Sequence, residues 1–228
     1  MPKEVAIITR AYNRLEYTIK VIQSVYENTN YPHYKHIIVD NGSTDGTREW
    51  LNWIKKLNCE RYNKIVPCLV KENYGDWGGM IHGAKTHGKD CQFIVQLDND
   101  IEISKGWLSA LIEVAERGKY DGVMLKRTGV KNQIKTIKDD TWKLNDGRIV
   151  KLGIVPFVVA CYICPSQYFF SVCNNVVRCR DFGKFKGGKC AKIKSMTCYH
   201  IDGWNEKNKT YNQHLKYPKN KMTWEKFS

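Results

Sequence analysis

The sequence predicts one α/β domain in which helices flank a mostly parallel sheet. Short apolar runs at 5–8, 36–39, 65–70 and 93–97 alternate with amphipathic stretches of helical length. Turn-forming polar residues follow each run, and 228 residues are enough for one substantial core. Strands and helices that alternate at this spacing are typical of parallel strands joined by right-handed crossovers.

The first two apolar runs are each followed by an expected helix. Apolar residues recur at helical spacing over 15–26, and the polar segment 29–32 ends that helix. A second helix is expected around 50–57, where Thr47 or Asp45 would cap the first turn. Each strand therefore leads into a helix, as a parallel sheet requires.

The fourth strand ends in two carboxylates, Asp98 and Asp100, one residue apart. On an extended segment their side chains point to the same side, at the carboxyl end of a strand, where open α/β sheets bind ligands. Mg²⁺ and Mn²⁺ favour such oxygen ligands together with substrate phosphates. A polar turn after the strand explains the same residues equally well. Before this strand we expect a glycine-rich loop at 73–79 and a short helix at 80–88.

The loops that begin at Thr9, Asp40, Asn73 and Asp98 each follow one of these four strands. Because the carboxyl ends of parallel strands lie at one edge of a sheet, we expect the loops to converge on one site.

The second half of the chain mixes apolar segments with a lysine-rich excursion over 128–146. The expected elements are, in order, a helix at 107–115 opened by Ser104 and closed by Gly118, a strand at 123–125, a hairpin of 141–144 and 148–152 that turns at Asp146-Gly147, a buried apolar segment at 155–163, a helix that begins at Tyr168, and a strand at 191–193.

The chain is basic, with 37 Lys and Arg against 23 Asp and Glu and a formal charge of +14. This balance favours anionic partners such as nucleotide phosphates, anionic glycans, a membrane surface or nucleic acid, although a solvated lysine-rich surface explains it as well. Cys161 and Cys164 form a single CxxC among nine cysteines, which argues against a zinc ribbon. We expect reduced thiols, no targeting or membrane-spanning segment, and a cytoplasmic location.

Four segments resemble motifs of family 2 glycosyltransferases in order and spacing. They are Ile8–Arg14, Val39–Thr47, Asn73–Gly75 and Leu97–Asp100. The resemblance, dense over roughly 5–110, implies the GT-A nucleotide-diphospho-sugar transferase fold with a smaller C-terminal acceptor-side part. It also implies transfer of a sugar from a nucleotide sugar, expected to be a UDP-sugar, to a hydroxyl of a glycan or glycolipid, with inversion. Arg10 departs from the pattern, because many relatives have proline there.

The same resemblance assigns roles to individual residues. It places the donor nucleotide against Thr9, Tyr12, Arg14, Asp40, Ser43, Asp45, Asn73, Gly75 and Asp98. It implies that Asp100 and His200 bind Mn²⁺ or Mg²⁺, and that Asp181 is the catalytic base. A base is needed because an acceptor hydroxyl is a poor nucleophile until its proton is removed. Arg180 stands where the family often has a first acidic residue.

We expect one domain over 1–228, divided by role. Residues 1–110 form the half that binds the nucleotide sugar, 111–204 the acceptor and catalytic half, and 205–228 a basic aromatic tail. Two alternatives stay open: a glycosyltransferase that acts on a hydroxylated DNA base, and a non-catalytic relative that binds nucleotide or nucleic acid. The first loop lacks GxGxxG, and no P-loop motif is present, which argues against a dinucleotide-dependent enzyme.

Overall fold

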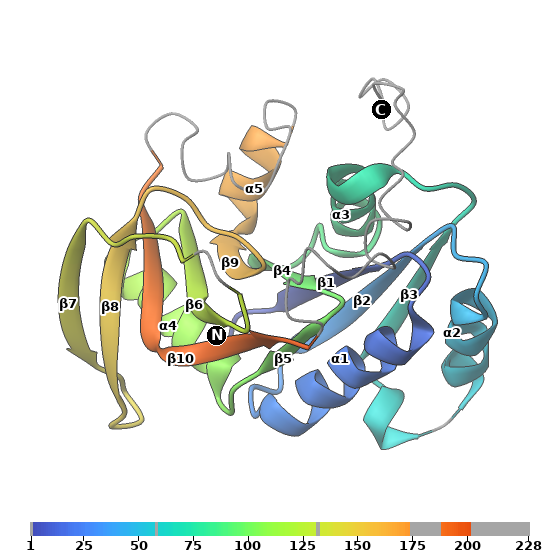
Figure 1. The fold of residues 1–228 in the computed structure, drawn as a ribbon, viewed down its shortest axis with the longest axis horizontal. Helices are drawn as coiled ribbons and strands as arrows, with labels where there is room; N and C mark the ends of the chain where they lie inside the picture. Colours follow the sequence, from blue (N-terminus) through green and yellow to red (C-terminus); the bar gives the residue numbers. More distant parts are fainter. Residues whose placement is uncertain (1, 58, 131–132, 174–187, 202–228) are drawn as a thin grey trace.

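The computed structural model describes residues 2–57, 59–130, 133–173 and 188–201, and in them ten strands form one sheet (Figure 1). The strand order is β3-β2-β1-β4-β9-β6-β10-β8-β7, and β5 pairs with β10. The strands are β1 Val5–Ala11, β2 Tyr34–Asn41, β3 Ile65–Val70, β4 Phe93–Asp98, β5 Ile101–Ile103, β6 Gly122–Thr128, β7 Lys138–Lys143, β8 Ile149–Val155, β9 Cys161–Pro165 and β10 Cys190–His200.

One side of the sheet is entirely parallel. β1 pairs with β2 and with β4, and β2 pairs with β3, all in parallel, so that Thr9 lies between Ile38 and Leu97. β1 and β2 are almost continuously buried, as expected for strands covered on both faces. The four strands predicted for the first half are confirmed, and all of them run toward the same sheet edge.

The other side of the sheet is mixed. β9 is antiparallel to both β4 and β6, β10 is parallel to β6, and β8 and β7 add two antiparallel strands at the outer edge. The predicted hairpin turn at Asp146-Gly147 is confirmed: the Gly147 N–H donates to the Leu144 carbonyl oxygen at 2.9 Å, and Gly147 has a φ of 87°. A φ in this region favours glycine.

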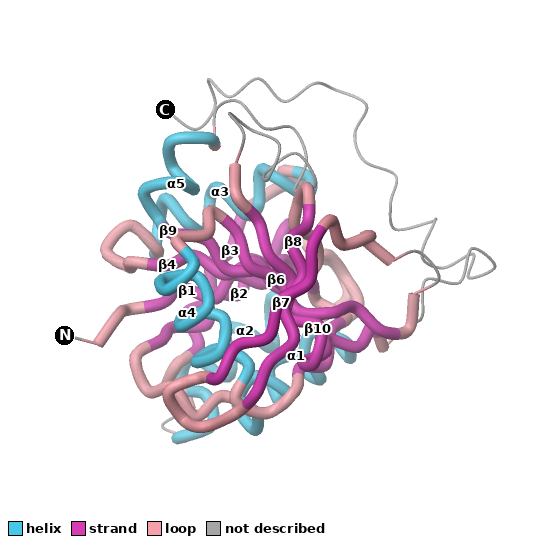
Figure 2. Tube along the Cα trace, turned by 90° about the vertical axis from the view of Figure 1, so that its left-hand side faces the viewer, coloured by secondary structure: helices cyan, strands magenta, loops and turns pink. Residues whose placement is uncertain are grey.

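Helices cover both faces of the sheet. They are α1 Leu15–Asn28, α2 Thr47–Lys56, α3 Gly75–His87, α4 Trp107–Gly118 and α5 Ser166–Val172, and a short 3₁₀ turn spans Glu60–Tyr62. Side chains of α1, α2 and α4 pack on one face, and those of α3 and α5 pack on the other. Figure 2 shows the strands as a layer between α3 and α5 on one side and α1 and α2 on the other.

The glycine-rich segment 73–79 is not a loop beyond Gly75, where α3 begins. A Cβ added to Gly79 would lie 3.3 Å from the Asn41 side chain, and one added to Gly83 would lie 2.6 Å from Val39. These glycines therefore let a helix approach the sheet closely, which local turn propensity does not predict.

Two helix caps and one apolar segment also differ from expectation. The N-cap residues of α2 and α4 are Gly46 and Gly106, both left-handed with φ of 93° and 69°, rather than Thr47 and Ser104.

The apolar segment 155–163 is divided between the end of β8 and the start of β9. Ala160, with a φ of 63°, lies just before β9.

Eight cysteines lie in the part of the chain that the structure describes, and all eight are free thiols. Seven are buried, and Cys59 is exposed. Burial raises the pKa of the Cys68 thiol to about 11 and that of Cys190 to about 12. Among the described residues no helix is long and apolar enough to cross a membrane.

Candidate functional site

The loops that follow the parallel strands contact one another, as the sequence predicts. The Asn13 N–H, after β1, donates to Ser43 Oγ at 2.8 Å, and Asn13 Oδ1 accepts from the Thr44 N–H. Asn41 Nδ2, at the end of β2, donates to Asn73 Oδ1 at 2.8 Å. These hydrogen bonds directly link the loops that follow β1, β2 and β3 at one sheet edge.

Asp40 and Asp45 belong to the second of these loops, and both carboxylates are already engaged. Asp40 is fully buried, accepts from the Ser43 N–H at 3.0 Å and lies 3.0 Å from Arg48 Nη2. Asp45 accepts from the N–H groups of Leu15 and Thr47, which begin α1 and α2. Burial would raise the pKa of Asp45, but hydrogen bonds from Thr47 and Leu15 outweigh it and lower that pKa. Asp45 thus links two helix N-termini.

Asn73 and Gly75 shape the entry to α3. Asn73 Oδ1 accepts from the Gly75 N–H at 2.8 Å, and Gly75 has a φ of 72°. Asn41 holds the same turn through its bonds to Asn73, to the Gly75 carbonyl and from the Tyr74 N–H. This network fixes the third loop against the end of β2.

Thr9 lies beneath the site rather than at its surface. It is fully buried, and its Oγ1 lies 2.9 Å from Nε2 of His36, which is also buried. Burial lowers the pKa of His36 to about 3, so the imidazole is neutral at physiological pH. Tyr12, just after β1, is half-buried.

Asp98 is held by an arginine from the neighbouring strand. Arg10 Nη2 donates to Asp98 Oδ1 at 2.9 Å, while its Nη1 donates to the Asp76 carbonyl at 2.6 Å and contacts the Asp76 carboxylate. Burial raises the pKa of Asp98, although Arg10 opposes that shift. Arg10 therefore joins β1, β4 and the first turn of α3 in one charged cluster.

Asp100 lies between Arg14 and His200. Its Oδ2 is 3.5 Å from Arg14 Nη1, and its Oδ1 is 3.6 Å from His200 Nδ1. Burial would raise the pKa of Asp100, but His200 and Arg14 outweigh it and hold that pKa below its ordinary value. β10 brings His200 here, about a hundred residues along the chain, because the Asp100 carbonyl accepts from the Ile201 N–H at 2.9 Å.

The pair of Asp100 and His200 fits a small divalent cation. Both ring nitrogens of His200 are buried without a hydrogen-bond partner among the described residues. An imidazole nitrogen beside a carboxylate oxygen suits Mn²⁺, and such ions complete their shell with substrate phosphates and water. Nowhere in the described ranges do three or more His, Cys, Asp or Glu side chains gather as a metal cluster. These two side chains could therefore supply part of a coordination shell.

Some predicted residues lie outside the described ranges, and some residues of this site were not predicted. Asp181, Arg180 and the tail 205–228 belong to the first group. Arg48 and Asp76 belong to the second. Their partners, Asp40 and Arg10, come from other elements, so no local pattern marks them. Arg10 could be found from the sequence, because it departs from the family motif.

A family model described as "Glycosyl transferase family 2" matches residues 6–175. TuaG of Bacillus subtilis (strain 168), by its name a glycosyltransferase of teichuronic acid biosynthesis, is 30% identical over 109 residues. That match covers 48% of this chain and 40% of TuaG.

Two solved structures share the fold. GalNAc-T7, with UDP, GalNAc and Mn²⁺, superposes with a TM-score of 0.68 at 12% identity, over 87% of this chain and 43% of its own. Residues 1–349 of S. aureus TarS, with UDP-GlcNAc, superpose at 0.62 and 14% identity, over 89% of this chain and 61% of that one. The matches thus span less than two thirds of each relative.

Proposed function

The chain belongs to glycosyl transferase family 2, with the GT-A fold, and from this premise we propose that it transfers a sugar from a nucleoside diphosphate to an acceptor hydroxyl. The observation that carries the proposal is the Asp98/Asp100 pair at the carboxyl end of β4. Each of these carboxylates is held by an arginine, and Asp100 also faces His200. This arrangement gathers the charges needed to bind and release a diphosphate.

Residues 1–110 would bind the donor, which we propose to be a UDP-sugar because the two structural relatives hold UDP or UDP-GlcNAc. Buried Asp40 and the bonded loops of Asn13, Ser43 and Asn73 would form the walls of the nucleoside pocket. Because these loops already hold one another, little conformational entropy is lost when the nucleotide binds.

Asp100 and His200 would hold Mn²⁺ or Mg²⁺ together with the donor diphosphate. Such an ion, when bound, would stabilise the negative charge that the leaving nucleoside diphosphate develops. Arg10 and Arg14 supply two further cations at this edge, within 3.5 Å of the carboxylates. They pair with Asp98 and Asp100, and we expect phosphate oxygens of a bound donor to take over these contacts.

The acceptor hydroxyl would lose its proton to Asp181 as the new bond to the anomeric carbon forms and the nucleoside diphosphate leaves, with inversion. Residues 111–204 would bind this acceptor. We further propose that the protein acts in the cytoplasm, because eight free thiols suit a reducing compartment.

The first test is thermal unfolding with UDP, other nucleoside diphosphates and UDP-sugars, each with and without Mn²⁺. We expect one nucleotide to raise the unfolding temperature by about 5 to 10 °C at a hundredfold excess over Kd, and only with Mn²⁺. Asp100→Asn and, separately, His200→Gln should remove this shift. The control Asp146→Asn, in the β7–β8 turn, should keep it.

A nucleotide shift that is independent of Mn²⁺ and survives Asp100→Asn would contradict the metal assignment. A protein that no nucleotide stabilises would contradict the donor assignment and favour a non-catalytic relative that binds nucleic acid. Transfer to a hydroxymethylated DNA oligonucleotide, but not to glycans, would identify a DNA base as the acceptor.

A further inference from the structure

Four lysines from three adjacent strands share one face of the mixed side of the sheet. We call this the lysine face: Lys126 of β6, Lys192 and Lys194 of β10, and Lys151 of β8. Lys192 pairs with Met124 and Gly153. Lys194 and Lys151 each adjoin the last pair of β10 and β8, Ile193 with Leu152, and both line one pocket. Because residues directly across neighbouring strands point to the same face, these side chains share it: Lys126 and Lys151 are exposed, Lys194 is half-buried and Lys192 is buried.

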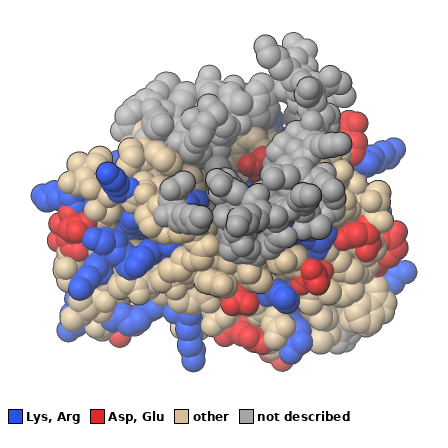
Figure 3. Space-filling view, in the orientation of Figure 1, with Lys and Arg blue, Asp and Glu red and all other residues tan. Residues whose placement is uncertain are grey.

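The lysine face lies on the side of the sheet opposite α4. Met124 lies two residues before Lys126, and Cys190 lies two residues before Lys192, so both share the lysine face, where they pack with α3 and α5. Leu125 and Ile193 are adjacent to these lysines in sequence, point to the other face and pack with α4. Figure 3 shows Lys and Arg gathered on the side of the molecule where Figure 1 places β7, β8 and β10.

The positive charge of the lysine face is only partly balanced. Lys194 Nζ pairs with Asp139 at 2.6 Å, and Lys192 Nζ donates to the Ile134 carbonyl at 2.6 Å. Burial lowers the pKa of Lys192, and the nearby charges of Lys194 and Lys126 lower it further. Like charges on adjacent strands cost stability, and a bound anion would remove that cost.

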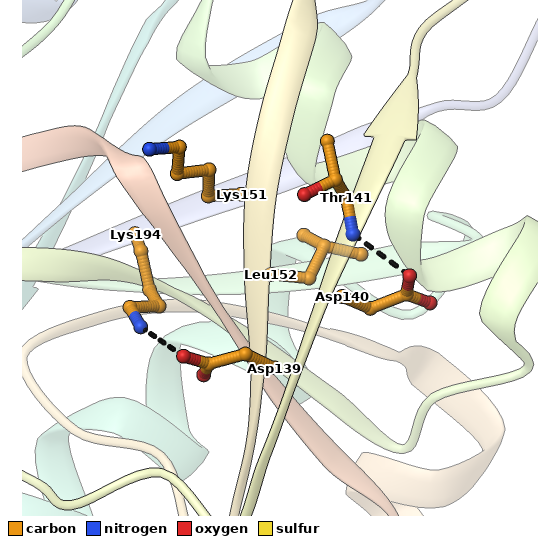
Figure 4. A pocket seen from close by; sticks show the side chains of 6 residues that line it. All are labelled: Asp139, Asp140, Thr141, Lys151, Leu152 and Lys194. Atoms are coloured by element: carbon orange, nitrogen blue, oxygen red, sulfur yellow. Dashed lines mark hydrogen bonds and ion pairs between the residues drawn. The ribbon is translucent and has the colours of Figure 1, made fainter.

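A pocket of about 280 Å³ lies at the outer end of this face. Figure 4 shows Lys151 and Lys194 extending toward the same side of β8, with Asp139 bound to Lys194. Lys151 is exposed. The pocket is also lined by Asp139 and Asp140, so two ammonium groups and two carboxylates surround a space close to the lower end of the range for ligand pockets.

The lysine face leads toward the proposed catalytic edge. Lys126 pairs with Thr197, three residues before His200 on β10, a span of about 10 Å along the strand. Tyr199, next to His200, is 46% exposed and pairs with Thr128, two residues beyond Lys126, so its ring lies on the same face. A chain-like ligand could therefore touch Lys126, Lys151 and Lys194 and reach the proposed donor site.

We propose that the lysine face binds the acidic groups, phosphate or carboxylate, of an anionic acceptor glycan and directs its hydroxyl toward the donor. This inference rests on the proposed glycosyl transfer. Single-stranded nucleic acid is disfavoured because its binding grooves stack bases on several aromatic rings, whereas Tyr199 is the one exposed ring among the described residues of this face.

The test measures binding by fluorescence anisotropy with four labelled probes: an oligogalacturonate, a phosphorylated oligomannoside, neutral dextran and a single-stranded DNA. The wild-type chain should bind at least one acidic glycan more tightly than dextran. The double variant Lys151→Gln/Lys194→Gln should bind it about tenfold more weakly, and Lys126→Gln a few-fold more weakly. The control Lys55→Gln/Lys56→Gln, with the same charge change on α2 beside the opposite sheet edge, should bind within twofold of wild type.

Several outcomes would overturn the proposal. The first is an equal loss of glycan affinity in the two double variants, and the second is no binding of either acidic glycan. The third is binding of the DNA, weakened in the Lys151/Lys194 variant, while no glycan binds. Binding of the phosphorylated oligomannoside would indicate phosphate as the recognised group, and binding of the oligogalacturonate would indicate carboxylate. UDP stabilisation with Mn²⁺ is measured in the same variants. If UDP does not stabilise the wild-type chain but the acidic glycan binds, the transfer proposal is refuted and the lysine-face proposal is supported.

Discussion

The parallel and mixed sides of the sheet differ in how far their charged side chains are paired with opposite charges. At the parallel edge, Asp40, Asp98 and Asp100 each lie beside an arginine within 3.5 Å. On the mixed side, Lys194 of the lysine face pairs with exposed Asp139, and Lys151 is exposed to solvent. The carboxylates at the ends of the parallel strands are thus already paired with cations, whereas the lysine face keeps positive charge that the proposed ligand would neutralise.

The largest expected effect comes from breaking the balance at the parallel edge. Arg10→Ala should lower the free energy of unfolding by about 2 to 3 kcal/mol, because Asp98 loses its cation in a site where Arg10 is only 11% exposed. Lys194→Ala, which breaks an exposed pair on the mixed side, should cost less than about 1 kcal/mol. Urea unfolding measures both.

The control for this comparison is Arg10→Lys, which keeps the charge but loses the forked geometry, and which should fall between wild type and alanine. Equal costs for Arg10→Ala and Lys194→Ala would show that the two sides do not differ in this way.

A second effect depends on pH and concerns His36, buried beneath the parallel edge. Its folded pKa, about 3, lies below the ordinary value of 6.5, so the unfolded chain binds a proton that the folded chain does not. Stability from this group is present above pH 6.5 and is lost as pH falls, by about 1.4 kcal/mol per unit. Between pH 7 and 5, wild type should therefore lose about 2 kcal/mol more than His36→Gln.

Urea unfolding at the two pH values gives this difference, and the partly exposed His33→Gln serves as the control. If wild type and His36→Gln lose the same free energy on acidification, His36 is not neutral in the folded protein.

The smallest effect tests the outer edge of the mixed side. Gly147→Ala meets no atom within 4 Å, so its cost is the left-handed backbone alone, about 1 kcal/mol. Because the turn lies on the β7–β8 hairpin, UDP stabilisation should not change. Thermal unfolding with and without UDP and Mn²⁺ tests both statements, and a loss of UDP stabilisation would show that the hairpin is coupled to the proposed donor site.

The same contrast explains what the sequence could predict. The strands and helices of the parallel side follow from local apolar periodicity, and the convergence of their loops follows from strand direction. The insertion of β9 between β4 and β6 does not, because antiparallel partners about 40 and 70 residues away leave no local signal. Similarly, the spacing of Asp98 and Asp100 predicts the candidate site. The ion pair of Arg48 with Asp40 could not be predicted, because it depends on the packing of α2 on the sheet.

The buried thiols make the two sides separately observable. Cys68 lies on β3 and Cys190 on β10, and with pKa values near 11 and 12 neither is a thiolate while its strand stays closed. We therefore expect each cysteine to be alkylated only when its own strand opens, so that the alkylation rate measures that opening. The chain carries native chemical reporters of local unfolding on both sides of the sheet, without an introduced label.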